Sequence, residues 1–361
     1  MKVLLIGPIP PPTDGCSYAN KVLQRNLDLK NIENEIINTN TNIVDQEQGN
    51  TFSIRKTVFF IKNYFNIYKV FYNDVIYFTP GQTFYGVVKY APFILSCILL
   101  KKPYVIHLHG NYLGCQYKKL SGLKKWLFHL LLSKASAAIV ITQSLTKNFD
   151  ELLSKKKILV VFNFVEQEFY KRAIVKKADK LRILYLSNLM PDKGIVEVLD
   201  ALIELDQKEI DFEATIAGHM EESVKYKFYK RLKVLKSKVN YLGTITGERK
   251  LNCLIEANTF ILPTYYKMEG LPIALLEGLA TGNIIITTEH AGIPDVINAN
   301  HGFIVPPRSS KAITESLIRI NENIGGYLEQ FSKSNIAYSK QNFTEENYTN
   351  KIVEVLYGIT S

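Results

Sequence analysis

The chain has 361 residues, of which 47% are hydrophobic and 22% are charged. This balance is typical of a folded globular protein and excludes a disordered or fibrous chain, and the length predicts two domains. The four cysteines, Cys16, Cys97, Cys115 and Cys253, form no C-x-x-C pair, so the sequence predicts neither a disulfide framework nor a zinc site. A reducing cytoplasm is the expected location.

Positive charge is concentrated in the first half of the chain. Residues 1–175 hold 22 Lys and Arg against 11 Asp and Glu, whereas the remaining residues hold 22 against 23. A basic surface attracts anionic partners such as nucleic acid or an anionic membrane face. The start of the chain lacks the pattern of a signal peptide. Residues 87–100 form the most apolar window, which is shorter than the ~20 residues of a spanning helix, so we expect a buried helix there.

Short β-branched runs alternate with helical patterns in the first half. This alternation predicts parallel strands joined by crossover helices, as in a doubly wound α/β sheet. The expected strands are residues 2–6, 74–78, 104–108, 137–141 and 158–162, and the expected helices include residues 17–29 and 123–133.

The pattern lapses after residue 162 and starts again near residue 182. Residues 166–180 are charged and lack an apolar stripe, so they are the expected linker. Further strands are expected at residues 182–186, 213–216, 239–242, 259–262 and 283–287, which predicts a second doubly wound domain. We therefore expect domains at residues 1–168 and 169–342, with a final helical segment, residues 343–361, packing back on the first domain.

The most informative segment is MEGLPIALLEGLATG, residues 268–282, which places Glu269 and Glu277 eight residues apart across a strand-to-helix junction. Pro272 suits the first helical turn. The free backbone N–H groups of that turn and the positive end of the helix dipole can bind a diphosphate. Glu269 would then lie beside an attached sugar, and Glu277 could accept hydrogen bonds from two ribose hydroxyls.

Here the sequence resembles the retaining glycosyltransferases of family 4, the glycosyl transferases group 1, which have the GT-B fold. The resemblance continues through residues 283–287, 292–296 and 301–306, and it is looser in the first half. It implies two doubly wound Rossmann-like domains that face each other across a cleft, with the acceptor on the N-terminal side and the nucleotide sugar on the C-terminal side. It implies that Glu269 contacts the sugar and that Glu277 binds the ribose. It also implies contacts with the donor by Gly270, Leu271, Pro272 and Ile273.

The loop LSNLMPDKG, residues 186–194, follows an expected strand and precedes a helix. Lys193 is placed to neutralise phosphate, and the resemblance makes it a ligand of the donor diphosphate. Asn188 stands where the family usually has a second cation, an arginine. This departure removes one fixed charge, so donor binding would depend more on Lys193 and the helix N-terminus.

In the first half, the run VIHLHG, residues 105–110, puts His109 at the carboxyl end of a strand, where open α/β sheets bind ligands. His107 points to the same side of the strand but lies deeper. The resemblance implies that His109 contacts the transferred sugar. The Pro- and Gly-rich loop of residues 7–16 leads into a helix, and Gly15 would let the backbone approach the donor phosphate or the acceptor.

The resemblance implies a reaction without a metal ion or other cofactor, and the sequence contains no Asp-x-Asp motif. Charge on the leaving diphosphate would be stabilised by Lys193 and backbone dipoles. Retention could arise by attack on the same face of the sugar, with Glu269 as a nucleophile left as the alternative. The expected donor is a UDP-hexose. The expected acceptor is a glycan or lipid-linked glycan in bacterial surface polysaccharide synthesis, such as O-antigen, capsule or exopolysaccharide.

The basic stretch of residues 117–134 carries the single tryptophan and is amphipathic, which suits peripheral contact with the anionic inner face of the cell membrane. Two other functions stay open. One is a nucleotide-sugar epimerase of the same fold. The other is a basic nucleic-acid-binding protein, against which the chain shows no recognition motif, so nucleic acid is not an expected partner.

Overall fold

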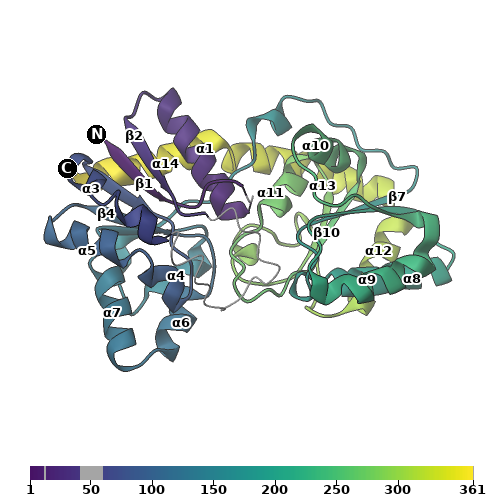
Figure 1. The fold of residues 1–361 in the computed structure, drawn as a ribbon. Helices are drawn as coiled ribbons and strands as arrows, with labels where there is room; N and C mark the ends of the chain where they lie inside the picture. The colour runs from purple at the N-terminus through teal and green to yellow at the C-terminus, as the bar shows by residue number, and fades with distance from the viewer. Residues whose placement is uncertain (12–13, 41–59, 361) are drawn as a thin grey trace. The chain divides into compact units, whose positions relative to one another are not determined.

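Two six-stranded parallel sheets, each flanked by helices, organise the protein (Figure 1). The computed structural model describes residues 1–11, 14–40 and 60–360. The chain divides into unit 1, which comprises residues 1–163, 268–271 and 345–361, and unit 2, which comprises residues 164–267 and 272–344. The division falls after residue 163, five residues before the expected boundary, and it assigns residues 268–271 to unit 1 rather than to the second domain.

The unit 1 sheet has the order β2-β1-β3-β4-β5-β6. Its strands are β1 (Val3–Gly7), β2 (Asn34–Asn38), β3 (Val75–Phe78), β4 (Tyr104–Leu108), β5 (Ala137–Val140) and β6 (Ile158–Val160). The four inner strands are mostly apolar and buried along their whole length, because the inner strands of a parallel sheet are covered on both faces. The order reverses between β1 and β3, and loops at the carboxyl ends of strands near such a switch point commonly bind ligands.

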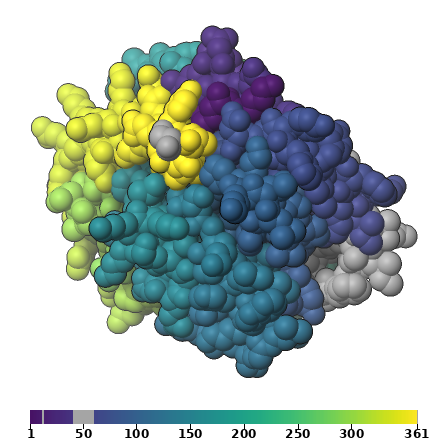
Figure 2. All heavy atoms as spheres, turned by 90° about the vertical axis from the view of Figure 1, so that its left-hand side faces the viewer, coloured from purple at the N-terminus to yellow at the C-terminus, as the bar shows by residue number. Residues whose placement is uncertain are grey.

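The helices of unit 1 include the chain's last segment. They are α1 (Gly15–Leu29), α3 (Lys69–Tyr72), α4 (Phe84–Val88), α5 (Ala91–Leu99), α6 (Leu113–Lys119), α7 (Gly122–Ser133) and α14 (Glu345–Thr360), with 3-10 turns η1 (Gln143–Phe149) and η2 (Lys155–Lys157). Helix α14 packs on α1, where the Asn26 amide donates to the Thr349 hydroxyl at 3.0 Å. Figure 2 shows the end of α14 in yellow beside the start of β1 in dark purple.

The unit 2 sheet has the order β12-β11-β10-β7-β8-β9. Its strands are β7 (Leu181–Leu186), β8 (Phe212–Ala217), β9 (Val239–Tyr241), β10 (Thr259–Leu262), β11 (Ile284–Thr287) and β12 (Gly302–Ile304). Strands β8 and β9 follow β7 to one side, and β10 returns to the other side of β7. The switch point of this unit therefore lies at the carboxyl ends of β7 and β10.

Amphipathic helices cover this second sheet. They are α8 (Ile195–Gln207), α9 (Glu222–Leu235), α10 (Gly247–Glu256), α11 (Ile273–Ala280), α12 (Ser310–Glu322) and α13 (Ile324–Asn342), with 3-10 turns η3 (Gln167–Tyr170), η4 (Pro191–Lys193), η5 (Lys236–Lys238) and η6 (Ile293–Asp295). In α8, Ile195, Val198, Leu202 and Leu205 are buried on one face. This spacing of three to four residues is that of a helix packed against a core.

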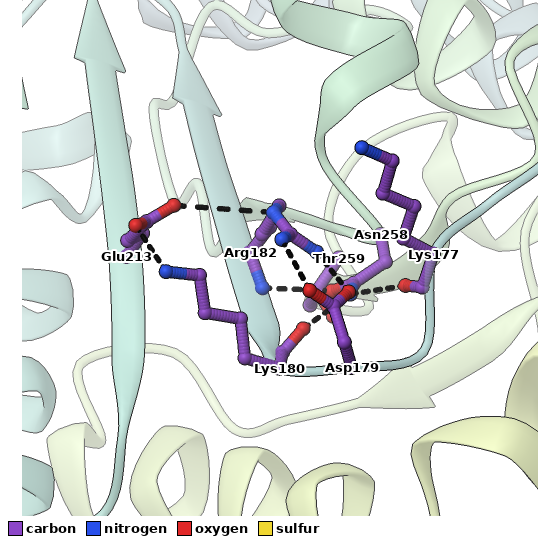
Figure 3. Close-up of polar contacts among 7 residues, drawn as sticks. All are labelled: Lys177, Asp179, Lys180, Arg182, Glu213, Asn258 and Thr259. Carbon is purple, nitrogen blue, oxygen red and sulfur yellow. Dashed lines mark hydrogen bonds and ion pairs between the residues drawn. The ribbon is translucent and has the colours of Figure 1, made fainter.

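The expected linker is held against unit 2 by the buried side chain of Asn258, just before β10 (Figure 3). Its amide donates to the carbonyl oxygens of Lys177 at 3.0 Å and Lys180 at 2.8 Å, and its oxygen accepts from the Arg182 N–H at 3.0 Å. The Arg182 guanidinium binds both carboxylate oxygens of Asp179 at 2.6 and 2.7 Å. The end of the expected linker is therefore held by hydrogen bonds from Asn258 and Arg182.

Most expected strands are found within one or two residues of their expected limits, and three features differ. Strands β2 and β12 were not expected. The single helix expected at residues 87–100 is wrong, because the chain forms α4 and α5 with a turn at Lys89–Tyr90 between them. Helix α5 buries Phe93, Ile94 and Cys97 but leaves Leu99 81% exposed, so only part of the window is core.

Candidate functional site

His109 directly follows β4 at the carboxyl edge of the unit 1 sheet. The segment 268–271, which also belongs to unit 1, lies against its backbone. A β-carbon at Gly270 would be 2.4 Å from the His109 carbonyl oxygen, closer than two such atoms can approach. Glycine at position 270 therefore allows the residue after Glu269 to contact the end of β4 directly.

Two carboxamide side chains from neighbouring loops hold the same segment. The Gln82 amide, four residues after β3, donates to the Met268 carbonyl oxygen at 3.0 Å. The Asn163 amide, three residues after β6, donates to the Leu271 carbonyl oxygen at 2.9 Å. Glu269 lies between these two contacts and is 8% exposed. Its backbone position is thus set by loops that follow β3, β4 and β6.

The imidazole of His109 is kept neutral by burial. Both ring nitrogens are buried and have no hydrogen-bond partner among the described residues. Burial lowers the pKa of His109 to about 4, although the nearby Asn163 carboxamide raises it in part. A neutral ring with unused nitrogens can donate one hydrogen bond and accept another. Such a group suits a ligand hydroxyl.

His107 is part of the interior instead. Its side chain is fully buried, its ring centre lies 4.1 Å from that of His109, and its Nδ1 shares a hydrogen bond with the Tyr77 hydroxyl. Burial, with a smaller effect from His109, lowers the pKa of His107 well below its usual value. The ring of His107 therefore packs against that of His109 in the interior of unit 1.

In unit 2, the loop after β7 brings Lys193 to the switch point. Turn η4 contains Lys193 and ends at Gly194, whose φ of 76° is in the left-handed region. A β-carbon at Gly194 would be 2.6 Å from the Pro263 carbonyl oxygen, so glycine lets η4 lie against the end of β10. The Lys193 ammonium lies 5.5 Å from the centre of the Tyr266 ring, beyond β10.

Asn188 lies earlier in this loop and is partly buried. Its carbonyl oxygen accepts hydrogen bonds from the Met190 N–H at 3.1 Å and from the Tyr185 hydroxyl at 3.4 Å. A neutral residue at this point leaves Lys193 as the cation of the segment from Ser187 to Gly194. The consequence of the missing arginine for donor binding stays a prediction.

Helix α11 begins at Ile273, and Pro272 occupies its N-cap position rather than its first turn. No side chain caps this end of the helix, so its first N–H groups can meet a ligand. Glu277 lies within α11 and is buried, with its Oε1 at 2.5 Å from the Lys250 ammonium. The expected donor-binding run is divided, because Gly270 and Leu271 belong to unit 1 whereas Pro272 and Ile273 belong to unit 2.

Gly15 is the first residue of α1, and residues 12–13 of its loop lie outside the described residues. Asp14 caps this helix, accepting from the Ser17 N–H at 2.7 Å in a capping box. A carboxylate already lies at this helix start, and it would repel an anionic donor. The expected role of Gly15, contact with the donor phosphate or the acceptor, stays a prediction.

The basic stretch expected at residues 117–134 forms the end of α6 and the whole of α7. Leu123 is 77% exposed and Trp126 is 60% exposed on α7, beside the exposed Lys124. Within the described ranges, no helix is both long and apolar enough to span a bilayer. No three metal-binding side chains are grouped in that part of the chain either, and the expected metal independence stays a prediction.

Comparisons with known proteins show similarity to glycosyltransferases. A model of the glycosyl transferases group 1 matches residues 166–337, most of unit 2. The chain is 32% identical over 147 residues to the amylovoran biosynthesis glycosyltransferase AmsK of Erwinia amylovora, which covers 39% of this chain and 36% of AmsK. It is 26% identical over 322 residues to an uncharacterized glycosyltransferase of Methanocaldococcus jannaschii, covering 81% of this chain and 77% of that protein. The chain thus spans about a third of AmsK.

A solved structure shows the same fold. Anabaena HepE in complex with UDP superposes with a TM-score of 0.74 at 15% identity, over 99% of this chain and all of HepE. The two parallel six-stranded sheets are those of the GT-B fold, and residues 166–337 are similar to the glycosyl transferases group 1.

Proposed function

We propose that this protein is a glycosyltransferase that moves a hexose from a UDP-sugar to a glycan or lipid-linked glycan. The proposal rests on the junction between β10 and α11. There Glu269 is fixed in a segment that contacts His109, and α11 starts with an uncapped N-terminus four residues before the buried Glu277. Uncapped helix amides, a buried carboxylate and a neutral histidine suit a diphosphate, a diol and a sugar hydroxyl, respectively.

In the proposed reaction, the bond between the anomeric carbon and the diphosphate oxygen breaks. The acceptor hydroxyl forms the new bond on the same face of the sugar, so the configuration is retained, and its proton goes to the leaving phosphate oxygen. Lys193 and the first amides of α11 stabilise the charge that develops on the diphosphate, without a metal ion. His109 binds a sugar hydroxyl through its neutral ring, and Glu269 contacts the sugar.

The names of two similar proteins support the proposed substrates. AmsK is named for amylovoran biosynthesis, and HepE was solved with UDP bound. For this chain, we propose a product among bacterial surface polysaccharides such as O-antigen, capsule or exopolysaccharide. The exposed Leu123 and Trp126 with the adjacent lysines support peripheral contact with an anionic membrane, where a lipid-linked acceptor would be found.

A transfer assay tests this function. Purified protein is incubated with UDP-glucose, UDP-galactose, UDP-N-acetylglucosamine or GDP-mannose, and with a lipid-linked glycan extract from a polysaccharide-producing bacterium. We expect nucleoside diphosphate release from a UDP-sugar that depends on the extract and continues in EDTA, with the anomeric configuration retained by NMR. Isomerised donor in the absence of extract would instead identify an epimerase. No turnover or binding of any donor would contradict the proposal.

A further inference from the structure

Lys250 of α10 lies between two carboxylates that come from different parts of unit 2. Its ammonium is 2.5 Å from Oε1 of Glu277 in α11 and 3.3 Å from Oε1 of Glu166, at the start of the expected linker. The side chains of Lys250 and Glu277 are 17% and 4% exposed, and that of Glu166 is 25% exposed. Three charged groups are therefore brought together with little access to water.

Burying a lone carboxylate costs free energy, and an ammonium in direct contact offsets that cost. Burial lowers the pKa of Lys250, but Glu277 and then Glu166 raise it above its usual value, so the ammonium stays charged. Phe169, which is buried in η3, lies under this ammonium at 5.4 Å from its ring centre. The ammonium of Lys250 is thus in contact with Glu277, Glu166 and Phe169, and it binds Oε1 of Glu277 directly.

An ammonium that binds only one oxygen of a carboxylate leaves the second oxygen available. We infer that Lys250 is a positioning residue for the nucleotide ribose: it binds Oε1 of Glu277, and the remaining oxygen of that carboxylate accepts from the ribose hydroxyls. The inference rests on the proposed function, which assigns the ribose to Glu277. Glu166, in the expected linker, is a second carboxylate in contact with Lys250, at 3.3 Å.

The arrangement has a specific consequence for substrate preference. Without the ammonium, the Glu277 side chain is free to rotate, and a carboxylate that is not oriented binds a hydroxyl pair poorly. Preference for a ribonucleotide over its 2′-deoxy analogue should therefore depend on Lys250. A merely structural lysine would change stability without changing this preference.

The experiment compares the binding of UDP and 2′-deoxy-UDP by calorimetry, with GDP and 2′-deoxy-GDP in parallel. We expect the wild type to prefer the ribonucleotide, and Lys250→Met to lose about tenfold of that preference, as for the loss of a hydrogen bond to a charged group. Lys250→Arg should keep most of it. Lys333→Met, which changes an exposed lysine of α13, is the matched control and should behave as the wild type.

The outcomes separate the two proposals. If the wild type binds neither UDP nor GDP, the proposed function fails. If the wild type prefers the ribonucleotide and a folded Lys250→Met protein keeps the same preference, the role of Lys250 is overturned. Should Lys250→Met unfold, Lys250→Gln, which keeps the hydrogen-bond donor and removes the charge, provides the same test with an expected loss of about threefold. An unchanged preference in that variant overturns the inference equally.

Discussion

The backbone of Gly270 lies directly on that of His109. A β-carbon at position 270 would be 2.4 Å from the His109 carbonyl oxygen and 2.5 Å from Cδ1 of Ile141. The backbone oxygen cannot move without shifting the end of β4, so the position of Glu269 and that of His109 depend on each other. This contact brings together two candidate site residues that lie far apart in the sequence, Glu269 and His109.

Substitution of Gly270 by alanine tests this dependence. We expect Gly270→Ala to push the 268–271 segment away from β4, lowering stability by about 1–3 kcal/mol, as for overpacking, and reducing turnover by more than the loss of folded protein explains. Urea unfolding and the transfer assay measure the two effects. Gly325→Ala is the control, because a β-carbon there meets nothing within 4 Å. Normal turnover in Gly270→Ala would show that the contact is not needed.

The neutral state of His109 predicts a pH dependence of stability. Its pKa is about 4 in the folded protein against a usual value of 6.5, so between these values the unfolded chain binds a proton that the folded chain does not. The stabilising contribution is therefore complete above pH 6.5 and is lost as the pH falls toward 4. Between pH 7.5 and 5, linkage gives a loss of about 2 kcal/mol from this group.

The non-titrating variant His109→Gln isolates that contribution. Urea unfolding at both pH values should show that His109→Gln loses about 2 kcal/mol less than the wild type over the interval. His107 responds to pH in both proteins, so the difference between them reports on His109. Equal losses in the two proteins would mean that the His109 ring is not held neutral by burial.

Lys176, inside the expected linker, binds the carbonyl oxygens at the C-terminal end of α10. Its ammonium donates to the carbonyl oxygens of Leu254 at 2.7 Å, Ile255 at 3.0 Å and Ala257 at 2.6 Å, and it lies 3.3 Å from Oδ1 of Asn283. The carbonyl groups of Leu254 and Ile255 belong to the last turn of α10, where a cation is favourable, although burial lowers the pKa of Lys176 to about 7. The connecting segment is thus joined to the core of unit 2 by a side chain.

Removal of this ammonium should be costly. We expect Lys176→Met to lower the free energy of unfolding by about 3 kcal/mol, because it leaves several buried carbonyl oxygens without a donor. Lys177→Met is the matched control, since the side chain of Lys177 is exposed, and it should change stability by less than about 0.5 kcal/mol. Similar melting of the two variants would refute the role of Lys176.

Membrane contact through α7 is tested with vesicles. We expect the wild type to float with vesicles that contain phosphatidylglycerol and not with phosphatidylcholine alone, because apolar and basic side chains act together. The double substitution Leu123→Ala and Trp126→Ala should reduce flotation several-fold. Tyr226→Ala, which removes an aromatic side chain that is 79% exposed on α9 of unit 2, should leave it unchanged. Binding that survives the double substitution would exclude α7 as the contact.

The buried strands could be predicted from sequence because their residues are continuously apolar. Strand β4 (YVIHL) has the predicted limits, whereas β2 (NEIIN) at the sheet edge was missed. An edge strand has one neighbour and tolerates polar residues, so its composition does not differ from that of a loop. Strand β12 has only three residues, Gly302–Ile304, too few for a period to be recognised.

The side chains that hold the candidate site could not be predicted in the same way. Gln82 and Asn163 contact the 268–271 segment from 186 and 108 residues away along the chain. Neither lies in a motif, and an amide in a loop is usually solvated. Lys250 likewise lies among polar residues at the start of α10, where a lysine usually faces solvent. Their roles follow from tertiary contacts, whereas the two acids, Lys193 and His109 could be proposed from local pattern and resemblance.

The central claim is that the segment containing Glu269 acts on a nucleotide sugar. Glu269→Gln, compared with Glu329→Gln on the exposed face of α13, tests it in the transfer assay and in UDP calorimetry. We predict that Glu269→Gln lowers turnover by about 100-fold or more, keeps UDP affinity within about threefold, and melts as the wild type does. Full turnover in a folded Glu269→Gln protein, or loss of turnover equally in Glu329→Gln, would contradict the account.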